Sequence, residues 1–421
     1  MSATPKWFTC TPFRFKGDHS FFTRESGLLC RGFQAIGVES KAVMPGPPMD
    51  NDQDDIVRAE PADLEDPQWW RSLGLDGVVL YAWGLPKYTK IASAITGAGV
   101  FLVSSIDASG LMSPYIAGPE YARALFSGRI AQHGMLLGPL LAAAALARSL
   151  VPRCFDLKRL EHLKHADRVT MVTPQAVEIM KALALRFGMP EVAARTSYMP
   201  HPQLPCFKYA GTPKENRVVS VGRWEKSAWH QKNPQLLVKS LGRFLERRSD
   251  YRATIVGNGV EALRSLFNPL APQVADRIRL IPFLPPEELL DIYLKSKIGF
   301  WTSRSEGQQG TGAQALCCGC SVVATAGVAM NCFAHYVSRG SGRQAVRNDA
   351  GFVADALLME AAAWDDGERD PALISHSWTR EFHHSNVARR YLRFGNEPPS
   401  VPNGAGLDEP DLGSDQRGPS V

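Results

Sequence analysis

The sequence lacks an apolar run long enough to cross a membrane. A spanning helix needs about 20 mostly apolar residues. The longest candidate, GMLLGPLLAAAALA at 134–147, contains Pro139 and is followed by Arg148. We therefore predict an internally packed helix here. Contact with a membrane surface or with a substrate is the alternative.

A large excess of one charge is also missing. The 421 residues carry a formal net charge of +5, with 21% charged and 44% hydrophobic residues. This small, diffuse excess argues against a nucleic-acid partner and suits a small anionic ligand or an acidic lipid surface. The length favours two domains of an ordinary soluble protein.

The eight cysteines do not form a metal-binding or disulfide pattern. Cys317, Cys318, Cys320 and Cys332 are clustered, but the chain lacks the two Cys-x2-Cys knuckles typical of structural zinc sites. We predict buried, reduced thiols in a cytoplasmic protein without a signal peptide. The Asp-x-Asp spacing in DNDQDD, at 50–55, is interpreted as a solvated surface turn, so no metal is expected.

Short apolar runs alternate with helical stretches along the chain. The predicted strands of the first half include 77–83, 99–106 and 168–173, and a second series begins at 217–222. The proline-rich segment 199–213 between the two series is typical of a linker. We therefore predict an α/β protein of two Rossmann-like domains that face each other across a cleft, with ligands at the carboxyl ends of the strands.

Two cations follow the first strand of the second half. Gly222 ends the strand and Arg223 comes directly after it, while Lys232 stands just before a predicted helix at 233–248. Cations at a strand end and near a helix N-terminus can clamp a diphosphate and stabilise the charge that it gains on leaving. The glycine turn IVGNG at 255–259 lacks the third glycine of a dinucleotide fingerprint, so we expect no hydride-transfer cofactor.

The loop SRSEGQQGTGAQALCCG, at 303–319, is the most informative stretch. Its glycines allow the backbone N–H groups to approach a ligand closely before a helix begins near Gly312. Glu306 can accept hydrogen bonds from sugar hydroxyls, and Gln314 lies on the first helical turn. A flexible helix-capping loop is the alternative.

These motifs together resemble the C-terminal half of the retaining GT-B glycosyltransferases of the "glycosyl transferases group 1", glycogen-synthase-like type (family 4). The resemblance covers residues 215–330 well and the rest of the chain more weakly. It implies that Arg223 and Lys232 hold the donor diphosphate and that Glu306 contacts the donor sugar. Gln314 takes the place of a second Glu that binds the ribose. The implied donor-binding set is Gly222, Gly307, Gly310, Thr311, Gln314, Gly17 and Asp18.

The sequence departs from the family pattern at several positions. Gln308 and Gln309 stand where an aromatic residue and a glycine are common. Asp107 remains where the family has His-Asp, and it is either a cleft residue or a helix cap. We interpret His19 and His201 as bystanders.

The resemblance implies domain boundaries and a function. We expect an acceptor domain at 1–208, a donor domain at 209–376, a C-terminal helix at 377–395 and a disordered tail at 396–421. The expected activity is transfer of a sugar from a nucleoside diphosphate sugar to an unidentified glycan, lipid or small-molecule acceptor, without a cofactor, in the cytoplasm or at the inner face of a membrane. The alternatives are a catalytically inactive binding module and a nucleotide-sugar epimerase.

Overall fold

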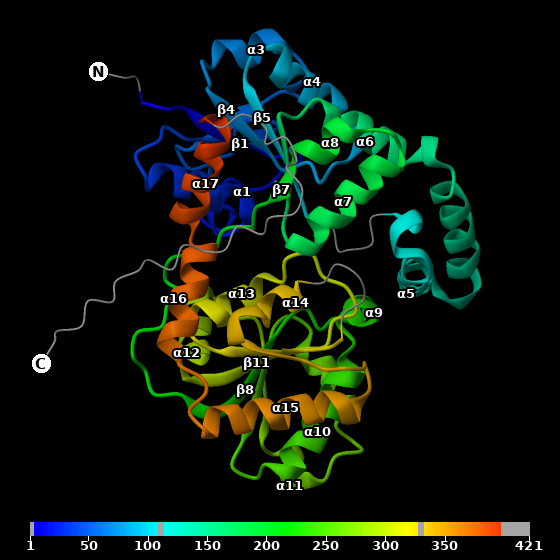
Figure 1. Ribbon diagram of the computed structural model, residues 1–421, viewed down its shortest axis with the longest axis vertical. Coiled ribbons are helices and arrows are strands. Elements are labelled where there is room, and N and C mark those ends of the chain that lie inside the picture. The colour runs from blue at the N-terminus through cyan, green and yellow to red at the C-terminus, as the bar shows by residue number, and fades with distance from the viewer. Residues whose placement is uncertain (1–3, 108–112, 327–331, 397–421) are drawn as a thin grey trace, which may run out of the picture.

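The computed structural model describes residues 4–107, 113–326 and 332–396. Within them the chain forms two parallel β-sheets, each covered by helices on both faces, stacked as two lobes (Figure 1). The sequence predicted a tail at 396–421, and residues 397–421 lie outside the described residues.

The first lobe contains a seven-stranded sheet of order β3-β2-β1-β4-β5-β6-β7. Its strands are β1 (Trp7–Cys10), β2 (Ala42–Pro45), β3 (Ile56–Ala59), β4 (Gly77–Leu80), β5 (Phe101–Ile106), β6 (Arg168–Met171) and β7 (Thr196–Tyr198). Its helices are α1 (Glu25–Gln34), α2 (Pro61–Leu64), α3 (Pro67–Ser72), α4 (Thr89–Gly97), α5 (Pro114–Ser149), α6 (Asp156–Lys164), α7 (Pro174–Arg186) and α8 (Pro190–Arg195).

The second lobe contains a six-stranded sheet of order β10-β9-β8-β11-β12-β13. Its strands are β8 (Glu215–Val221), β9 (Arg252–Val256), β10 (Ile278–Ile281), β11 (Ser296–Trp301), β12 (Ser321–Ala324) and β13 (Gly342–Gln344). Its helices are α9 (Trp229–Lys232), α10 (Pro234–Arg247), α11 (Pro272–Ala275), α12 (Pro286–Lys295), α13 (Gly310–Cys317), α14 (Phe333–Tyr336) and α15 (Ala350–Asp365). The strands predicted in this half agree closely with those observed.

The C-terminal segment forms two helices where the sequence predicted one. α16 (Pro371–Phe382) packs against α13, and α17 (His384–Asn396) packs against α1 in the first lobe (Figure 1). The helix breaks at His383, which has an extended backbone and forms a β-bridge with Gln203. The chain therefore crosses between the lobes twice, and Tyr391 joins the core around Trp7.

The helix predicted around 134–147 is not internally packed. It is the second arm of α5, and only 11% of the most apolar stretch of that helix is buried. By length and composition α5 passes the test for a membrane-spanning helix, but non-helical backbone at Gly118 and Gly134 interrupts it. The interpretation as a core helix was wrong because the helical period cannot reveal whether a partner surface exists.

The clustered cysteines lie in the core of the second lobe, as expected. Cys317, Cys318, Cys320 and Cys332 are fully buried, and the Cys320 thiol donates to the carbonyl oxygens of Tyr293 and Ser296. Burial raises the pKa of the Cys320 thiol. Among the residues that the structure describes, no group of three His, Cys, Asp or Glu is placed to hold a metal ion.

The acidic turn at 50–55 lies at the surface, as predicted, with four of its six residues exposed, but Asp52 is partly buried. The carboxylate of Asp52 lies 2.6 Å from the guanidinium of Arg58, whose side chain is buried and also donates to the Phe15 carbonyl. This pairing lowers the pKa of Asp52. Asp52 therefore fastens the loop after β2 to the body of the lobe.

A close backbone contact explains the glycine turn after β9. A Cβ atom on Gly257, whose φ is +137°, would lie 1.8 Å from the carbonyl oxygen of Gly222. Glycine is therefore needed here so that the ends of β8 and β9 can approach each other.

We expect Gly257→Ala to destabilise the protein by about 2 kcal/mol or more, because the new methyl group meets a backbone oxygen and φ is unfavourable. The midpoint of thermal unfolding checks this, with an expected decrease of about 4 °C or more. Gly74→Ala is the control, because Gly74 has φ +61° and a Cβ atom added there would meet no atom within 4 Å. Equal decreases for the two variants would contradict the steric explanation.

Candidate functional site

The carboxyl ends of the strands in the second lobe open into a cavity of about 580 Å³. Three segments that are distant in the sequence meet there: the end of β8, the end of α9, and the loop between β11 and α13. Of the residues predicted to bind the donor or to act on it, those lining the cavity are Gly222, Arg223, Lys232, Glu306, Gly310, Thr311 and Gln314.

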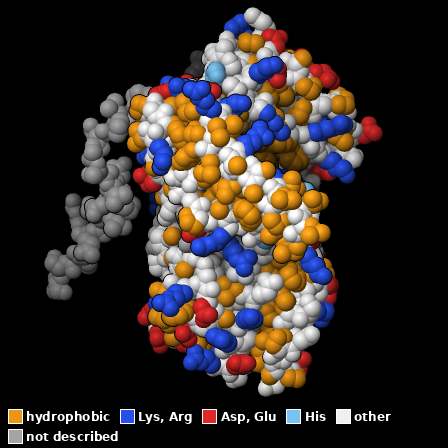
Figure 2. Space-filling view, turned by 90° about the vertical axis from the view of Figure 1, so that its right-hand side faces the viewer, with side chains coloured by type: hydrophobic (Ala, Val, Ile, Leu, Met, Phe, Trp, Pro, Cys, Tyr) orange, Lys and Arg blue, Asp and Glu red, His pale blue; other side chains and the backbone are white. Residues whose placement is uncertain are grey.

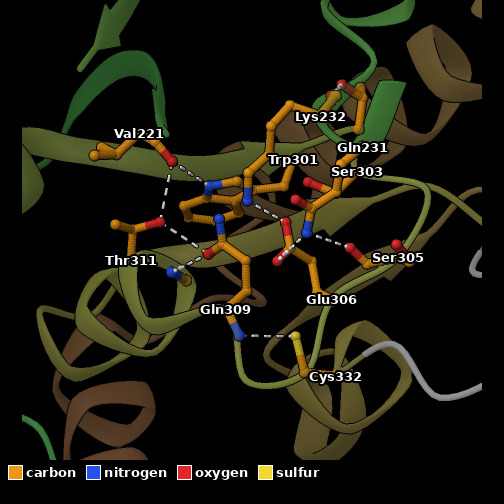
Figure 3. A network of polar contacts seen from close by, with 12 residues as sticks. Val221, Gln231, Lys232, Trp301, Ser303, Ser305, Glu306, Gln309, Thr311 and Cys332 are labelled. Atoms are coloured by element: carbon orange, nitrogen blue, oxygen red, sulfur yellow. Dashed lines mark hydrogen bonds and ion pairs between the residues drawn. The ribbon is translucent and has the colours of Figure 1, made fainter. Parts of the chain in front are cut away.

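A buried ion pair lies at the inner end of this cavity. The ammonium group of Lys232 contacts the carboxylate of Glu306, and both side chains are less than a tenth exposed (Figure 3). Gln231 Nε2 donates to Glu306 Oε2 at 3.4 Å and to the Ser305 carbonyl at 2.9 Å. A buried charge is costly without a partner, so each member of the pair holds the other in place.

Arg223 supplies a second positive charge at the cavity. It follows β8 directly, its side chain is exposed, and none of the described residues forms an ion pair with it. Arg223 and Lys232 thus provide two cations in one cavity, of which Arg223 is free to bind an anion. Glu25 and Glu306 are the acidic residues of the lining.

The start of α13 is held by Gln309. Its side-chain oxygen accepts from Gly312 N at 2.7 Å and from the Thr311 hydroxyl at 2.8 Å (Figure 3). Thr311 also donates to the carbonyl of Val221, the last residue of β8. Gln309 therefore caps the helix through Gly312 N, while Gly310 N and Thr311 N donate to no described residue.

Gln314 presents an unsatisfied acceptor at this cavity. Its Oε1 atom is buried and accepts no hydrogen bond from any described residue. A buried acceptor without a donor is costly, and a ligand hydroxyl would satisfy it.

The loop also reaches the first lobe, through Gln308, Asp107 and His201, of which His201 had been interpreted as a bystander. The Gln308 side chain accepts from His201 N at 2.6 Å and donates to the His201 carbonyl at 2.8 Å. Gln308 N donates to Asp107 at 3.4 Å, and the Asp107 carboxylate lies 3.6 Å from His201 Nε2. Asp107, His201 and Gln308 thus form a polar contact between the lobes.

Four predicted site residues are not part of the cavity lining: Asp107, whose contact between the lobes is described above, and Gly17, Asp18 and Gly307. Gly17 packs against Asp52, so that a Cβ atom would lie 2.3 Å from Asp52 Oδ1. Asp18 accepts from the backbone N–H and the hydroxyl of Ser20. Gly307 is buried within the loop next to Glu306.

Other lining residues were missed. Thr23 and Glu25 come from the first lobe, at the start of α1, and Phe283, Leu284 and Leu289 form an apolar end beside β10 and α12. Phe283 is 66% exposed, which is unusual for a large aromatic side chain. The only feature of the sequence that could have indicated a place at the cavity for Phe283 is that it stands two residues after the end of strand β10.

The Asp107 and His201 pair makes stability depend on pH. Burial alone would lower the pKa of His201, but the neighbouring Asp107 carboxylate outweighs it, so the pKa is raised. A raised pKa stabilises the folded state below the unfolded value of about 6.5, and this stabilisation is lost as pH rises through the folded pKa.

We therefore expect Asp107→Asn to lower the thermal midpoint more at pH 5.5 than at pH 8.5. Asp54→Asn serves as the control, since Asp54 is exposed and outside this contact. Thermal unfolding at both pH values measures the difference. A loss that is equal at both, or larger at pH 8.5, would rule out a protonated His201 as the cause.

Comparisons with known proteins bear on the family of the second lobe and on the fold. The family model described as "Glycosyl transferases group 1" matches residues 215–359, the part of the chain that carries most of the cavity. A search of curated protein sequences found no match.

Solved structures resemble the chain over most of its length. Anabaena HepE in complex with UDP has 13% identity and a TM-score of 0.58, covering 92% of this chain and 98% of that one. The lipopolysaccharide outer core galactosyltransferase WaaB has 13% identity, a TM-score of 0.59 and the same coverage. The pneumococcal O-GlcNAc transferase GtfA, in complex with UDP and GlcNAc, has 10% identity and a TM-score of 0.59, covering 93% and 99%.

The chain therefore has the GT-B fold, with two Rossmann-like domains facing each other, which confirms the predicted fold class. Its second domain matches a glycosyltransferase family.

Proposed function

We propose that the protein transfers a sugar from a nucleoside diphosphate sugar to an acceptor. The observation that carries this proposal is the meeting of Arg223, Lys232, Glu306 and Gln314 in one cavity. Two cations there suit a diphosphate, and a carboxylate and an amide oxygen suit sugar hydroxyls. HepE and GtfA, which share the fold, were solved with UDP bound.

The donor would lie along the cavity with its diphosphate near Arg223 and the start of α13. There the cations and the free N–H groups would stabilise the charge on the leaving diphosphate. The apolar end at Phe283 would accept the base, and the Gln314 oxygen would accept from a ribose hydroxyl. No metal is needed for charge neutralisation in this arrangement.

The buried ion pair has a role in this proposal. Without a ligand, Lys232 and Glu306 neutralise each other. A bound donor would offer a phosphate oxygen to Lys232 and sugar hydroxyls to Glu306. The pair would thus be exchanged for two ligand contacts, in which Lys232 meets a negative charge and Glu306 accepts hydrogen bonds, so that neither buried group is left without a partner.

We further propose that transfer retains the anomeric configuration. Support comes from the spacing of Arg223, Lys232 and Glu306, which resembles that of retaining enzymes. NMR of the first-formed product, which distinguishes the two anomers of the transferred sugar, tests this step. An inverted product would refute retention while leaving glycosyl transfer intact.

We expect Arg223→Ala to slow nucleoside diphosphate release by about 100-fold or more, because it removes a charge that stabilises the leaving group. Release is measured with UDP, GDP and ADP sugars, after a thermal-shift screen has found the donor that binds. The control is Arg380→Ala, an exposed arginine on α16 outside the cavity. Unchanged turnover in Arg223→Ala would eliminate the proposed clamp.

Gln314→Glu should tighten donor binding by about 5- to 10-fold, since a carboxylate accepts a ribose hydroxyl more strongly than an amide does. Isothermal titration calorimetry with the donor measures the affinity. Gln235→Glu adds the same charge on the exposed first turn of α10 and should have no effect. Flat or weaker binding in Gln314→Glu would show that Gln314 does not face the ribose.

A second candidate function is a binding module without catalysis. It is favoured by the amide at Gln314 and by the use of the Gln308 side chain in holding His201. The same release assay separates the candidates. Donor binding without release of the nucleoside diphosphate supports the binding module, and release supports the transferase. Inversion of a stereocentre of the donor sugar in the absence of an acceptor supports an epimerase.

A further inference from the structure

The long helix α5 is a helical hairpin that projects from the first lobe (Figure 1). The chain reverses at Gly134, where the backbone is not helical. Near the root, the Tyr121 and Ser149 hydroxyls are 2.7 Å apart. Near the tip, a Cβ atom on Gly138 would lie 2.5 Å from the Ile130 Cα atom. These contacts place the two arms side by side and antiparallel.

The tip of the hairpin exposes large apolar side chains. The exposed fractions are 74% for Met135, 88% for Leu136, 60% for Leu137, 69% for Leu140 and 42% for Leu141. They follow one another along the first two turns of the second arm. Single exposed leucines are ordinary in soluble proteins, but a contiguous group of this kind marks a surface that binds another apolar phase.

Beyond Glu120, the charged side chains of the hairpin and of the segment that follows it are all of one sign, with Arg129 nearest the tip and the others toward the root. Between Glu120 and Asp156 the sequence contains no Asp or Glu, and its charged residues are Arg123, Arg129, Arg148 and Arg153. No described acidic residue forms an ion pair with any of the four. Figure 2, which views this side of the molecule, shows apolar surface across the middle with Lys and Arg side chains bordering it.

The dimensions of the hairpin suit the surface of a bilayer and not its full thickness. The turn at Gly134 divides α5 into arms of roughly 15 residues, which at about 1.5 Å per residue reach roughly 22 Å. A spanning helix needs about 30 Å. An apolar face beside arginines is instead the pattern of helices that lie at the interface between headgroups and acyl chains.

The root of the hairpin is fixed to both lobes. It forms one wall of a cavity of about 540 Å³, through Tyr121 and Arg123, while the opposite wall carries His230 and Arg304 of the second lobe. α5 therefore has a defined direction relative to the donor cavity.

We propose that the α5 hairpin docks the protein onto an anionic lipid bilayer, with Met135, Leu136, Leu137, Leu140 and Leu141 inserted at the interface and with Arg129 and Arg148, one on each arm, facing acidic headgroups. Charge complementarity selects this occupant. A second copy of the chain would bring the same arginines toward one another, whereas anionic lipid neutralises them. The proposal concerns attachment alone and does not depend on glycosyl transfer.

Flotation with phosphatidylcholine vesicles, with and without phosphatidylglycerol, tests the docking. We expect at least 10-fold more protein to float with the anionic vesicles, and added salt to reduce this binding. The double variant Leu136→Glu/Leu137→Glu should lower binding to anionic vesicles by at least 10-fold. Leu373→Glu, at a leucine that is 63% exposed on α16, should leave it unchanged.

A double charge-reversal variant tests the electrostatic contribution to vesicle binding separately. Arg129→Glu/Arg148→Glu should reduce binding to anionic vesicles by at least 10-fold. The control Lys239→Glu/Arg380→Glu makes the same change in net charge at exposed sites on α10 and α16. It should change binding to anionic vesicles by less than about 2-fold. Thermal unfolding verifies that each variant is folded.

Three results would overturn the proposal. The first is absence of vesicle binding by the unmodified protein. The second is equal binding by the Leu136→Glu/Leu137→Glu variant. The third is a dimer, seen by analytical ultracentrifugation, that this variant dissociates while vesicle binding is weak throughout, which would assign the apolar tip to a second copy of the chain.

Discussion

The parallel pairing of the strands is the constraint on which the site depends. Every strand pair that the structure describes is parallel, so the carboxyl ends of neighbouring strands lie at one edge of each sheet. The chain must return through a helix after each strand, and the loops that begin these returns accumulate at that edge. Gly222 and Gly257 show how closely the loops approach. A cavity at this edge thus follows from the topology itself.

Polar contacts between distant segments place the charged and polar side chains that line the cavity. Lys232 and Glu306 are 74 residues apart in sequence, and their contact ties the end of α9 to the loop after β11. Gln309 shapes the start of α13, and Gln308 extends the same loop to His201 in the other lobe. The residues that would hold a donor therefore also help to connect the two lobes. Binding and the relative position of the lobes are expected to be coupled for this reason.

The proposed attachment surface and the proposed donor cavity lie on different parts of the protein. The proposed donor cavity depends on the second lobe, with Thr23 and Glu25 contributing from α1. The apolar tip of α5 lies at the far end of a hairpin whose root faces the second lobe near His230 and Arg304. A bilayer held at the tip would keep the whole protein at a fixed orientation to the lipid surface. Such an arrangement would suit a substrate that is itself presented at a membrane.

The sequence by itself determined the strands of the second lobe and the positions of Arg223, Lys232 and Glu306. Local alternation of apolar runs, glycine turns and charges records which residues end a strand, and parallel pairing brings those ends together. Tertiary structure alone decided the rest. It placed Gly17 and Asp18 outside the cavity lining, joined His201 to Asp107, and broke the last helix at His383. It also left the α5 tip uncovered. These features depend on which distant surfaces meet, and a periodic pattern shows that a helix has an apolar face without showing what covers it.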